Sequence, residues 1–514
     1  MKRTRSARTR RIPGDAGKPP RRNGQAEAAE GGGLLSMAQA IELLKTTRST
    51  FYRWLRAGRL NGMKVGRQWR FDRGEIERFL HGEEPRIALR SDILPLAVAL
   101  EERAAELGAP PLAAPEDSEV ARAAFAMIRL GMALEASDLH VHPHVGGDGH
   151  TRSGMVRYRV DGVLHPSQEF DIRLLPPLVA YWKRLAGCNP QESGRPQYGV
   201  LIHGAGEGRV EVRASFVPSV IGESVTGRLL SAHAQLDLDA LGYAPSDLER
   251  LTRSIEGRSG LIVLDGPVGS GKSMSMYACL GHLAGPGVKV VSVEDPVERL
   301  LPWVEQTQVS EREGLGFARA AVSFLRSDAD VIALGEIRDN EALELCLQAS
   351  LTGHVVLTTL HAGRAAKALR RMIEIGAPPF VVADATTLIV SQRLVRALCP
   401  HCSKEGEIPG ETLARAERLC RGSGLDWDVL PKTFRRTTGC AKCRDLGYRG
   451  RLLIAETLSV TPRIGEALRR GASAEELQAL AVDEGMKTMA ADGIGKAVEG
   501  ATTIEEVLRT VAAG

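Results

Sequence analysis

One eight-residue segment constrains the fold of this 514-residue chain more than any other part of the sequence. Residues 266–273 read Gly-Pro-Val-Gly-Ser-Gly-Lys-Ser and fit the pattern G-x-x-x-x-G-K-[ST]. An apolar run over residues 261–264 predicts a strand before the segment, and a helical pattern begins after it at Met274. A glycine-rich loop in this setting binds phosphate, because its backbone N–H groups can surround phosphate oxygens at a helix N-terminus.

We therefore predict that this loop binds a nucleoside triphosphate, with ATP as the expected ligand. Lys272 would place its charge at the β- and γ-phosphates, and the hydroxyl of Ser273 would be a ligand of Mg²⁺. The predicted nucleotide-binding residues are Gly266, Pro267, Val268, Gly269, Ser270, Gly271, Lys272 and Ser273.

The segment 234–395 alternates short Val/Ile/Leu runs with helical stretches. Beyond the run at 261–264, such runs occur at 288–293, 331–334 and 355–359. This alternation is typical of a mostly parallel sheet with helices on both faces. The fold class predicted for this part of the chain is therefore α/β.

Two acidic residues follow predicted strands after the loop, where an open α/β sheet binds its ligand. Glu294 follows the run at 288–293, and Glu336 follows the run at 331–334. A nucleotide-hydrolysing site needs a carboxylate at such a position to align water and Mg²⁺. We predict catalytic roles for both glutamates, although Gly335 stands where the metal-binding Asp of such a strand is usual.

Length and composition indicate a multidomain globular protein. Five hundred and fourteen residues suggest about three or four domains, and 43% hydrophobic with 25% charged residues is ordinary for soluble proteins. Residues 1–33 hold nine Lys/Arg against three Asp/Glu and show no hydrophobic periodicity, so we expect a disordered basic tail. No apolar stretch is long enough to span a membrane, and no secretory signal is recognisable, so we expect a cytoplasmic protein.

Residues 34–82 have the pattern of a small separate domain. Ser36 and Gln39 form a capping box before one short helix, and Thr47 can cap a second. A hairpin-like stretch and a last helix through Leu80 follow. Together with the sequences at 47–55 and 65–70, this order resembles an excisionase-type or MerR-like winged helix-turn-helix.

That resemblance leaves two roles open. Arg48 and Arg53 would project from the second helix and Arg67 from the wing, where a DNA reader meets the double helix. Helix-turn-helix folds also serve as protein adaptors. We therefore keep DNA binding and docking to another protein as equal possibilities.

The remaining segments are a linker, a mixed α/β region and a C-terminal region. Residues 83–118 look like a linker that contains one amphipathic helix, and residues 119–233 look mixed. Residues 396–514 look helical around two C-x-x-C pairs, Cys399/Cys402 and Cys440/Cys443. Four thiolates in two such pairs suit a structural Zn²⁺ ion in a reducing compartment.

Four segments in the α/β region resemble, in order and spacing, the Walker A, Asp box, Walker B and His box of the secretion ATPase superfamily. They are residues 266–273, 293–298, 325–339 and 351–361. The chain is most similar to the ATPases of type II secretion and type IV pilus assembly over about residues 119–511. Such a resemblance implies a RecA-like ATPase core preceded by a PAS-like domain at 119–233, with the tetracysteine element typical of the assembly and secretion branch.

The same resemblance implies further site residues. Arg213 and Arg228 match segments whose arginines reach the γ-phosphate, and His354 and His361 match the two ends of the His box. After His361 the chain has Ala-Gly-Arg where the family usually has Thr-Asn-Asp. Such proteins are hexameric rings at the cytoplasmic side of the inner membrane, where ATP hydrolysis moves a membrane platform protein.

Two functions of different classes follow from the sequence. The favoured one is a ring-forming, Mg²⁺-dependent ATP hydrolase that drives type II secretion or type IV pilus-like assembly. The alternative is a DNA-associated ATPase or regulator that uses the helix-turn-helix and the basic tail. DNA-stimulated, salt-sensitive behaviour would favour the second function.

Overall fold

The computed structural model divides the chain into two compact units, Met1–Ala88 and Leu89–Gly514. The residues that the structure describes are 34–56, 60, 63–65, 68–71, 73–80, 89–204, 209–230, 237–310, 314–421, 423, 425–431 and 433–511. The basic tail predicted at 1–33 lies outside them. Among the described residues, no helix is both long and apolar enough to cross a membrane.

The first unit contains short helices and a three-stranded antiparallel sheet in the order β1-β3-β2. The capping box predicted at Ser36 and Gln39 is present at the start of α1. Phe51 and Phe71 are fully buried and meet edge to face, with ring centroids 5.0 Å apart. The elements are β1 (Leu35–Ser36), α1 (Met37–Leu43), α2 (Arg48–Arg56), β2 (Met63–Val65), β3 (Gln68–Phe71) and α3 (Arg73–Leu80).

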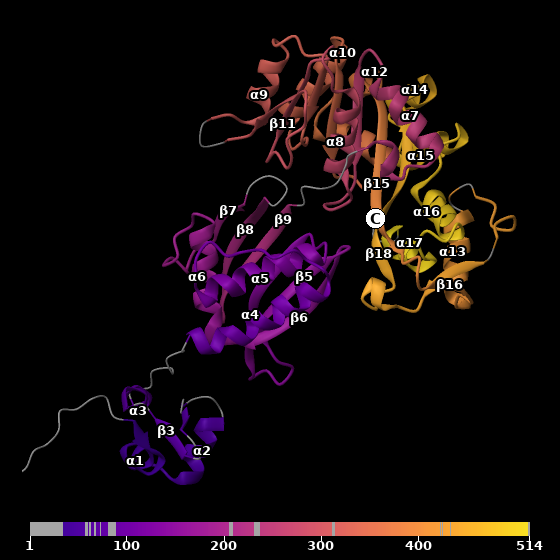
Figure 1. The fold of residues 1–514 in the computed structure, drawn as a ribbon. Coiled ribbons are helices and arrows are strands. Elements are labelled where there is room, and N and C mark those ends of the chain that lie inside the picture. Colours follow the sequence, from indigo (N-terminus) through magenta and orange to yellow (C-terminus); the bar gives the residue numbers. More distant parts are fainter. Residues whose placement is uncertain are drawn as a thin grey trace, which may run out of the picture. The chain divides into compact units, whose positions relative to one another are not determined.

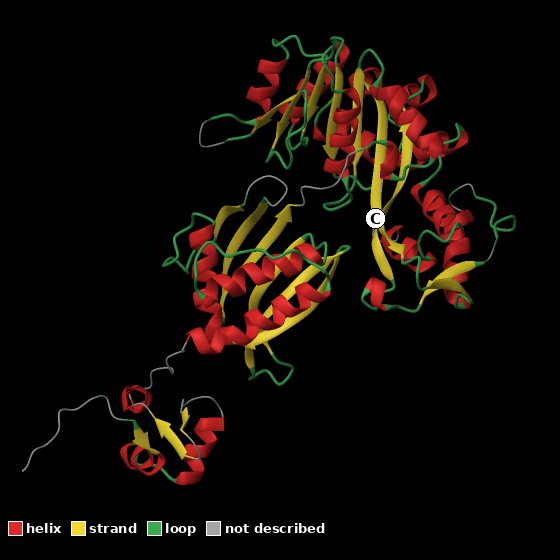
Figure 2. Cartoon of the chain, in the orientation of Figure 1, coloured by secondary structure: helices red, strands yellow, loops and turns green. Residues whose placement is uncertain are grey.

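The second unit begins with a six-stranded antiparallel sheet in the order β6-β5-β4-β9-β8-β7. Helices cover one face of this sheet (Figure 2). Along β4, Leu139 and Val141 are fully buried, whereas the histidines between and after them are half-buried on the opposite face. The elements are α4 (Leu89–Glu106), α5 (Glu119–Ala133), β4 (Asp138–Val145), β5 (Arg152–Val160), β6 (Val163–Asp171), α6 (Leu175–Leu185), β7 (Gln197–His203), β8 (Val210–Ser219) and β9 (Gly222–Leu230).

Helix α4 lies in the segment that the sequence suggested as a linker. Ile93, Ala97 and Leu100 are buried, and the helix packs against α5. Arg122 of α5 also forms a two-bonded ion pair with Glu101 of α4, with N–O distances of 2.8 and 2.6 Å. Residues 89–106 are therefore part of the second unit.

A seven-stranded sheet in the order β12-β11-β13-β14-β10-β15-β18 forms the centre of the α/β core. All neighbouring pairs are parallel except β15–β18, which is antiparallel. Every residue of β10, β11, β13 and β14 is buried, because helices cover both faces. The strands are β10 (Gly260–Asp265), β11 (Val290–Glu294), β12 (Val304–Gln308), β13 (Val331–Leu334), β14 (Val355–Leu360), β15 (Thr386–Leu398) and β18 (Tyr448–Ser459).

The predicted parallel α/β core is confirmed, and each of the four apolar runs predicted as strands is one. The helices of this core are α7 (Pro245–Ile255), α8 (Lys272–Leu283), α9 (Phe317–Phe324), α10 (Asn340–Leu351), α11 (Ala365–Ile375) and α12 (Pro379–Ala385).

Strands β15 and β18 extend from this sheet into the C-terminal region (Figure 1). The sequence did not predict β18, and β15 runs past residue 395, where the sequence suggested a domain boundary. Helices are present around the cysteine pairs, as predicted, together with a short two-stranded sheet. The elements are β16 (Ser403–Gly406), α13 (Gly410–Arg421), β17 (Phe434–Thr437), α14 (Pro462–Arg469), α15 (Ala474–Asp483), α16 (Met489–Val498) and α17 (Ile504–Val511).

An ion pair attaches the last helix, α17, to β15. Glu506 is buried and accepts hydrogen bonds from Arg396 at 2.6 Å and from Arg509 at 2.7 Å. Burial raises the pKa of Glu506, but the two guanidinium groups more than offset this effect and lower the pKa to about 2. The guanidinium of Arg396 also lies 4.0 Å from the ring centroid of Tyr448.

We predict that Glu506→Gln destabilises the attachment of α17 by about 3 kcal/mol, because it leaves a half-buried arginine without its charge partner. Since folding lowers the pKa of Glu506, its contribution is complete above about pH 4.5 and is lost as the pH falls toward 2. Hydrogen exchange of residues 504–511 measures the effect, with Glu505→Gln on the same helix as the control. Unchanged protection in the Glu506 variant would contradict this account.

Candidate functional site

The glycine-rich loop joins the carboxyl end of β10 to the N-terminus of α8, as predicted. Lys272, the first residue of α8, folds back so that its Nζ donates to the carbonyl oxygens of Gly266 at 2.6 Å and Pro267 at 3.1 Å. Burial lowers the pKa of Lys272, and the carboxylates of Asp265 and Glu336 partly offset this effect. The ammonium group of Lys272 therefore lies at the centre of the loop, where it can bind a phosphate group.

Two contacts with Gln392 of β15 stabilise the glycine-rich loop. A Cβ atom on Gly266, which has φ of 149°, would lie 2.4 Å from the carbonyl oxygen of Gln392, so only glycine fits there. The side-chain amide of Gln392 donates to the Ser270 carbonyl at 3.1 Å and accepts from the Tyr243 hydroxyl at 2.7 Å. Because all these groups are buried, the loop conformation is tightly determined.

Glu294 ends β11 and is buried, with its carboxylate at the edge of the same site. It accepts hydrogen bonds from the hydroxyl of Tyr277, from Ser292 Oγ at 2.6 Å and from Gln306 Nε2 at 3.0 Å. Tyr277 lies on α8, five residues after the loop lysine, and its oxygen also accepts from the backbone N–H of Glu298 at 2.9 Å. Burial raises the pKa of Tyr277, so this side chain is a neutral donor.

Glu336 follows β13, and its carboxylate is one of several polar side chains in contact with one another. Its carboxylate accepts from Arg338, and His361 Nε2 lies 3.7 Å from it. The other ring nitrogen of His361 lies 3.4 Å from Lys272 Nζ. His361 therefore bridges the predicted catalytic carboxylate and the predicted phosphate-binding lysine.

The turn after β14 keeps His361 in this position. The backbone N–H groups of Ala362 and Gly363 donate to the buried carboxylate of Asp265 at 2.6 and 3.0 Å, and Ser391 Oγ donates at 2.8 Å. Backbone groups make two of these bonds. The Ala-Gly sequence after His361 therefore suffices to tie this turn to the end of β10.

Steric crowding explains why glycine stands at position 335, directly after β13. A Cβ atom there would lie 3.2 Å from the Val293 carbonyl oxygen and 3.4 Å from the Glu294 Cα atom. The Gly335 N–H donates to that same carbonyl at 2.8 Å. The close approach of β13 and β11 thus favours glycine where an Asp is usual.

A cavity of about 780 Å³ joins these groups to the six-stranded sheet. Lys272, Ser273, Glu294, Glu336 and His361 line it from the core, and five residues of the sheet and its adjoining turns line it from the other side. Those five are Ser137, Asp138, Arg159, Gly162 and Arg228. Arg159 and Tyr277 also line the cavity, and no motif in the sequence indicated a role for either residue.

Two predicted residues lie away from this cavity. Arg213 donates from Nη2 to the Val297 carbonyl oxygen at 2.7 Å, in the loop after Glu294. His354 precedes β14 and its Nδ1 lies 3.0 Å from the Ala349 carbonyl oxygen. A six-residue strand spans about 20 Å, so His354 lies at the opposite edge of the sheet from His361.

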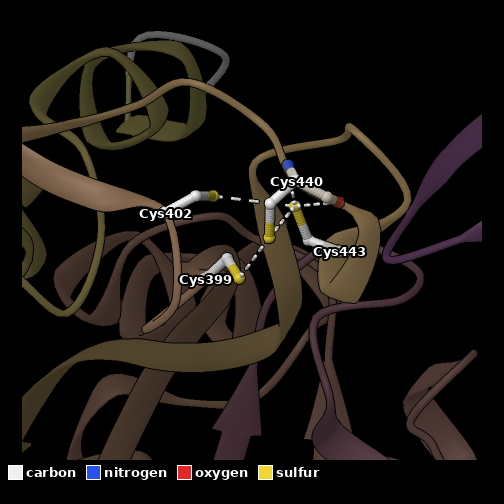
Figure 3. Close-up of side chains that lie close together, drawn as sticks. All are labelled: Cys399, Cys402, Cys440 and Cys443. Carbon is white, nitrogen blue, oxygen red and sulfur yellow. Dashed lines mark hydrogen bonds between the residues drawn. The ribbon is translucent and has the colours of Figure 1, made fainter.

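The four cysteines of the C-x-x-C pairs gather at the end of the β15–β18 pair (Figure 3). Their sulfur atoms all lie within 4.8 Å of one another, and the closest pairs are 3.7–3.9 Å apart. A tetrahedral site with metal–sulfur bonds of about 2.3 Å has edges of about 3.8 Å. The predicted cluster of Cys399, Cys402, Cys440 and Cys443 can therefore hold a metal ion.

Hydrogen bonds to sulfur support the same interpretation. The backbone N–H groups of Cys440 and Gly447 each donate to Cys443 Sγ at 3.2 Å. The hydroxyl of Thr437 lies 3.5 Å from Cys402 Sγ, and this contact together with those to the other three sulfur atoms lowers the pKa of Cys402 to about 7, whereas burial raises the pKa of Cys399 to about 11. Such donors stabilise thiolates, which are the form that binds a metal.

The first unit shows one of the three predicted DNA-contacting arginines. Arg48 is exposed at the start of α2, and its guanidinium carbon lies 5.9 Å from the centroid of the Tyr52 ring. Arg67 and the side chain of Arg53 lie outside the described residues.

Comparison with known families gives two matches along the chain. The family described as "Type II/IV secretion system protein" matches residues 113–509. A family described as "Helix-turn-helix domain" matches residues 34–83.

Comparison with individual proteins agrees with the larger match. The chain is 38% identical over 388 residues to the type IV pilus assembly ATPase PilB of Thermus thermophilus, which covers 75% of this chain and 42% of that protein. It is 37% identical over 396 residues to the type II secretion system protein E of Klebsiella pneumoniae, covering 77% of this chain and 76% of that protein. Among solved structures, the fold is similar to that of the Legionella pneumophila ATPase DotB, with a TM-score of 0.55, 18% identity and coverage of 76% of this chain and 95% of that one.

Proposed function

Because the chain belongs to the type II/IV secretion system protein family, we propose that it hydrolyses ATP with Mg²⁺ and uses the energy for type II secretion or type IV pilus-like assembly. The observation that carries this proposal is the cavity where the glycine-rich loop, two strand-end carboxylates and three arginines meet. This combination suits phosphoryl transfer, in which positioning and charge stabilisation supply nearly all of the catalysis.

Each group in the cavity has a definite part in that reaction. Lys272 exchanges its bonds to the loop carbonyls for bonds to the β- and γ-phosphates, and the loop N–H groups bind phosphate oxygens. Glu336 orients the attacking water, and Arg228 faces the charge that develops on the transferred group. Glu294, held by Tyr277, keeps a second carboxylate at the edge of the site.

The oxygen donors that line the cavity fit Mg²⁺. Ser273 offers a hydroxyl and Glu294 and Glu336 offer carboxylates, and such hard oxygen ligands are those that Mg²⁺ prefers. When bound, the ion would neutralise part of the charge of the phosphate groups.

We further propose a homohexameric ring that works at the cytoplasmic side of the inner membrane on a platform protein. The names of the relatives, a pilus assembly ATPase and a type II secretion protein, support this setting. The tetracysteine cluster favours the assembly and secretion branch over retraction. The chain aligns with 42% of the length of the Thermus relative, so its own partners remain part of the proposal.

We predict that Lys272→Ala abolishes nucleotide binding, whereas Glu336→Gln binds ATP and slows turnover by at least about a hundredfold. The lysine contacts ground-state phosphates, but the glutamate acts only on the attacking water. Fluorescent nucleotide titration and phosphate release measure both effects in the full chain.

An exposed carboxylate of the same core provides the control for these variants. Glu374→Gln, on α11, should leave binding and turnover unchanged because it lies outside the cavity. Wild-type turnover in the Glu336 variant would remove this residue from catalysis, and no ATP hydrolysis by the wild-type chain would refute the proposed function.

The ion that we propose for the cysteine cluster is Zn²⁺, since four thiolates at tetrahedral distances form a structural zinc site. We predict about one zinc per chain by elemental analysis, and loss of that zinc with local unfolding in Cys402→Ser. Cys188→Ser, which changes a cysteine outside the cluster, should keep the metal. Four freely titrating thiols and no zinc in the purified wild type would contradict the site.

A second function is favoured by the helix-turn-helix match at residues 34–83. We propose that this unit either binds DNA or docks the motor on a protein, and exposed Arg48 at the start of α2 supports the DNA alternative. If the unit binds DNA, DNA would regulate the ATPase core or bring it close to a DNA site.

Under the DNA alternative, the full chain binds duplex DNA with an affinity that falls steeply as salt rises. Arg48→Ala and Arg53→Ala weaken binding by about tenfold each, whereas Arg73→Ala, which pairs with Glu77 on α3, is the matched control. Fluorescence anisotropy measures binding. Binding that depends only on residues 1–33 and is unchanged in the α2 variants would favour docking to a protein.

A further inference from the structure

A row of four charged residues crosses four strands of the six-stranded sheet. On β4, Asp138 lies directly opposite Arg159 of β5 and, on its other side, directly opposite Arg228 of β9. Arg228 in turn lies opposite Arg213 of β8. One carboxylate therefore stands between two arginines at neighbouring positions of the sheet.

Asp138 forms ion pairs with both arginines at once. Its Oδ1 lies 3.2 Å from Arg228 Nε, and its Oδ2 lies 3.6 Å from Arg159 Nε. The hydroxyl of Ser137 donates to Oδ2 at 2.8 Å, which fixes the carboxylate from a third direction. Arg228 meets Asp138 through Nε, so its outer nitrogens remain directed away from that carboxylate. Arg159 also meets Asp138 through Nε, and its Nη1 donates to the carbonyl oxygen of Gly162 at 3.1 Å, which holds this side chain at a second point.

Burial differs sharply within this group. The side chain of Asp138 is 12% exposed, whereas those of Arg159 and Arg228 are 38% and 57% exposed. Ion pairs between half-exposed arginines and a carboxylate contribute little to stability. A contribution to folding stability therefore does not explain why two arginines pair with one buried carboxylate at this position.

The position of the group in the cavity supplies such a reason. Asp138, Arg159 and Arg228 all line the cavity that contains the phosphate-binding loop. Without a carboxylate between them, two guanidinium groups on adjacent sites would repel each other, and each long side chain would sample many rotamers. The two ion pairs with Asp138 reduce the repulsion between the guanidinium groups and restrict their rotamers before a ligand binds. The arginines are therefore preorganised for binding.

We propose that Asp138 is a positioning residue that holds Arg159 and Arg228 toward the phosphate groups of ATP, and that Arg159 contacts the nucleotide together with Arg228. The proposal rests on the proposed ATP hydrolysis. Arg213, bonded to Val297 in the loop after Glu294, stays outside this pair.

The experiment measures steady-state ATP hydrolysis and melting temperature for Asp138→Ala and Asp138→Asn in the full chain. Asp138→Ala should lower kcat by about tenfold and change KM by less than about twofold, because the arginines act mainly on the transition state. Asn keeps one acceptor oxygen, so Asp138→Asn should retain more turnover than the Ala variant. Asp171→Asn alters another Asp–Arg pair, formed by the last residue of β6 with Arg173 in the helical turn after it, and should leave kcat unchanged because neither residue lines the cavity.

A combined variant separates positioning from a general structural effect. If Asp138 acts through Arg159 and Arg228, adding Asp138→Ala to a chain that already carries Arg159→Ala and Arg228→Ala lowers kcat much less than it does in the wild type. The two reductions would multiply if Asp138 acted independently, and this result, or full turnover in Asp138→Ala, would overturn the proposal. A wild-type chain without ATPase activity would instead refute the proposed function itself.

Discussion

The parallel register of β10, β11, β13 and β14 is the constraint on which the rest of the site depends. Carboxyl ends of parallel strands meet at one edge of a sheet, and the register pairs Leu264 with Thr359, Val293 with Leu334 and Leu334 with Thr358. The residues after these strand ends, from the phosphate-binding loop to Glu336, therefore converge without any long connection. A shift of one residue in any strand would turn its side chains to the opposite face.

Strand β15 links this edge to the rest of the chain. Gln392 supports the glycine-rich loop, Arg396 pairs with Glu506 of the last helix, and Cys399 follows the strand directly. One continuous backbone thus connects the nucleotide site, the C-terminal helix and the cysteine cluster.

The sequence was sufficient for the features that depend on local pattern. The loop with Lys272, the carboxylates after predicted strands and the cysteine pairs all follow from spacing, and the structure brings each set together. Contacts that depend on tertiary register were not predictable: the pairing of Asp138 with two arginines requires the order of an antiparallel sheet, and the Tyr277–Glu294 bond requires the packing of α8 on β11. His354 was predicted as a site residue from its motif, but a motif gives only its position along the chain. Its distance from the cavity depends on the direction of β14.

The central claim is that the cavity around Lys272 is the site of ATP hydrolysis. The most direct measurement is an experimental structure of the full chain with Mg²⁺ and a non-hydrolysable ATP analogue. The account predicts that Lys272 Nζ leaves the carbonyl oxygens of Gly266 and Pro267 and contacts the β- and γ-phosphates, with the Glu336 carboxylate facing the γ-phosphate. A nucleotide bound elsewhere, or a bound nucleotide with Lys272 still on those two carbonyls, would contradict it.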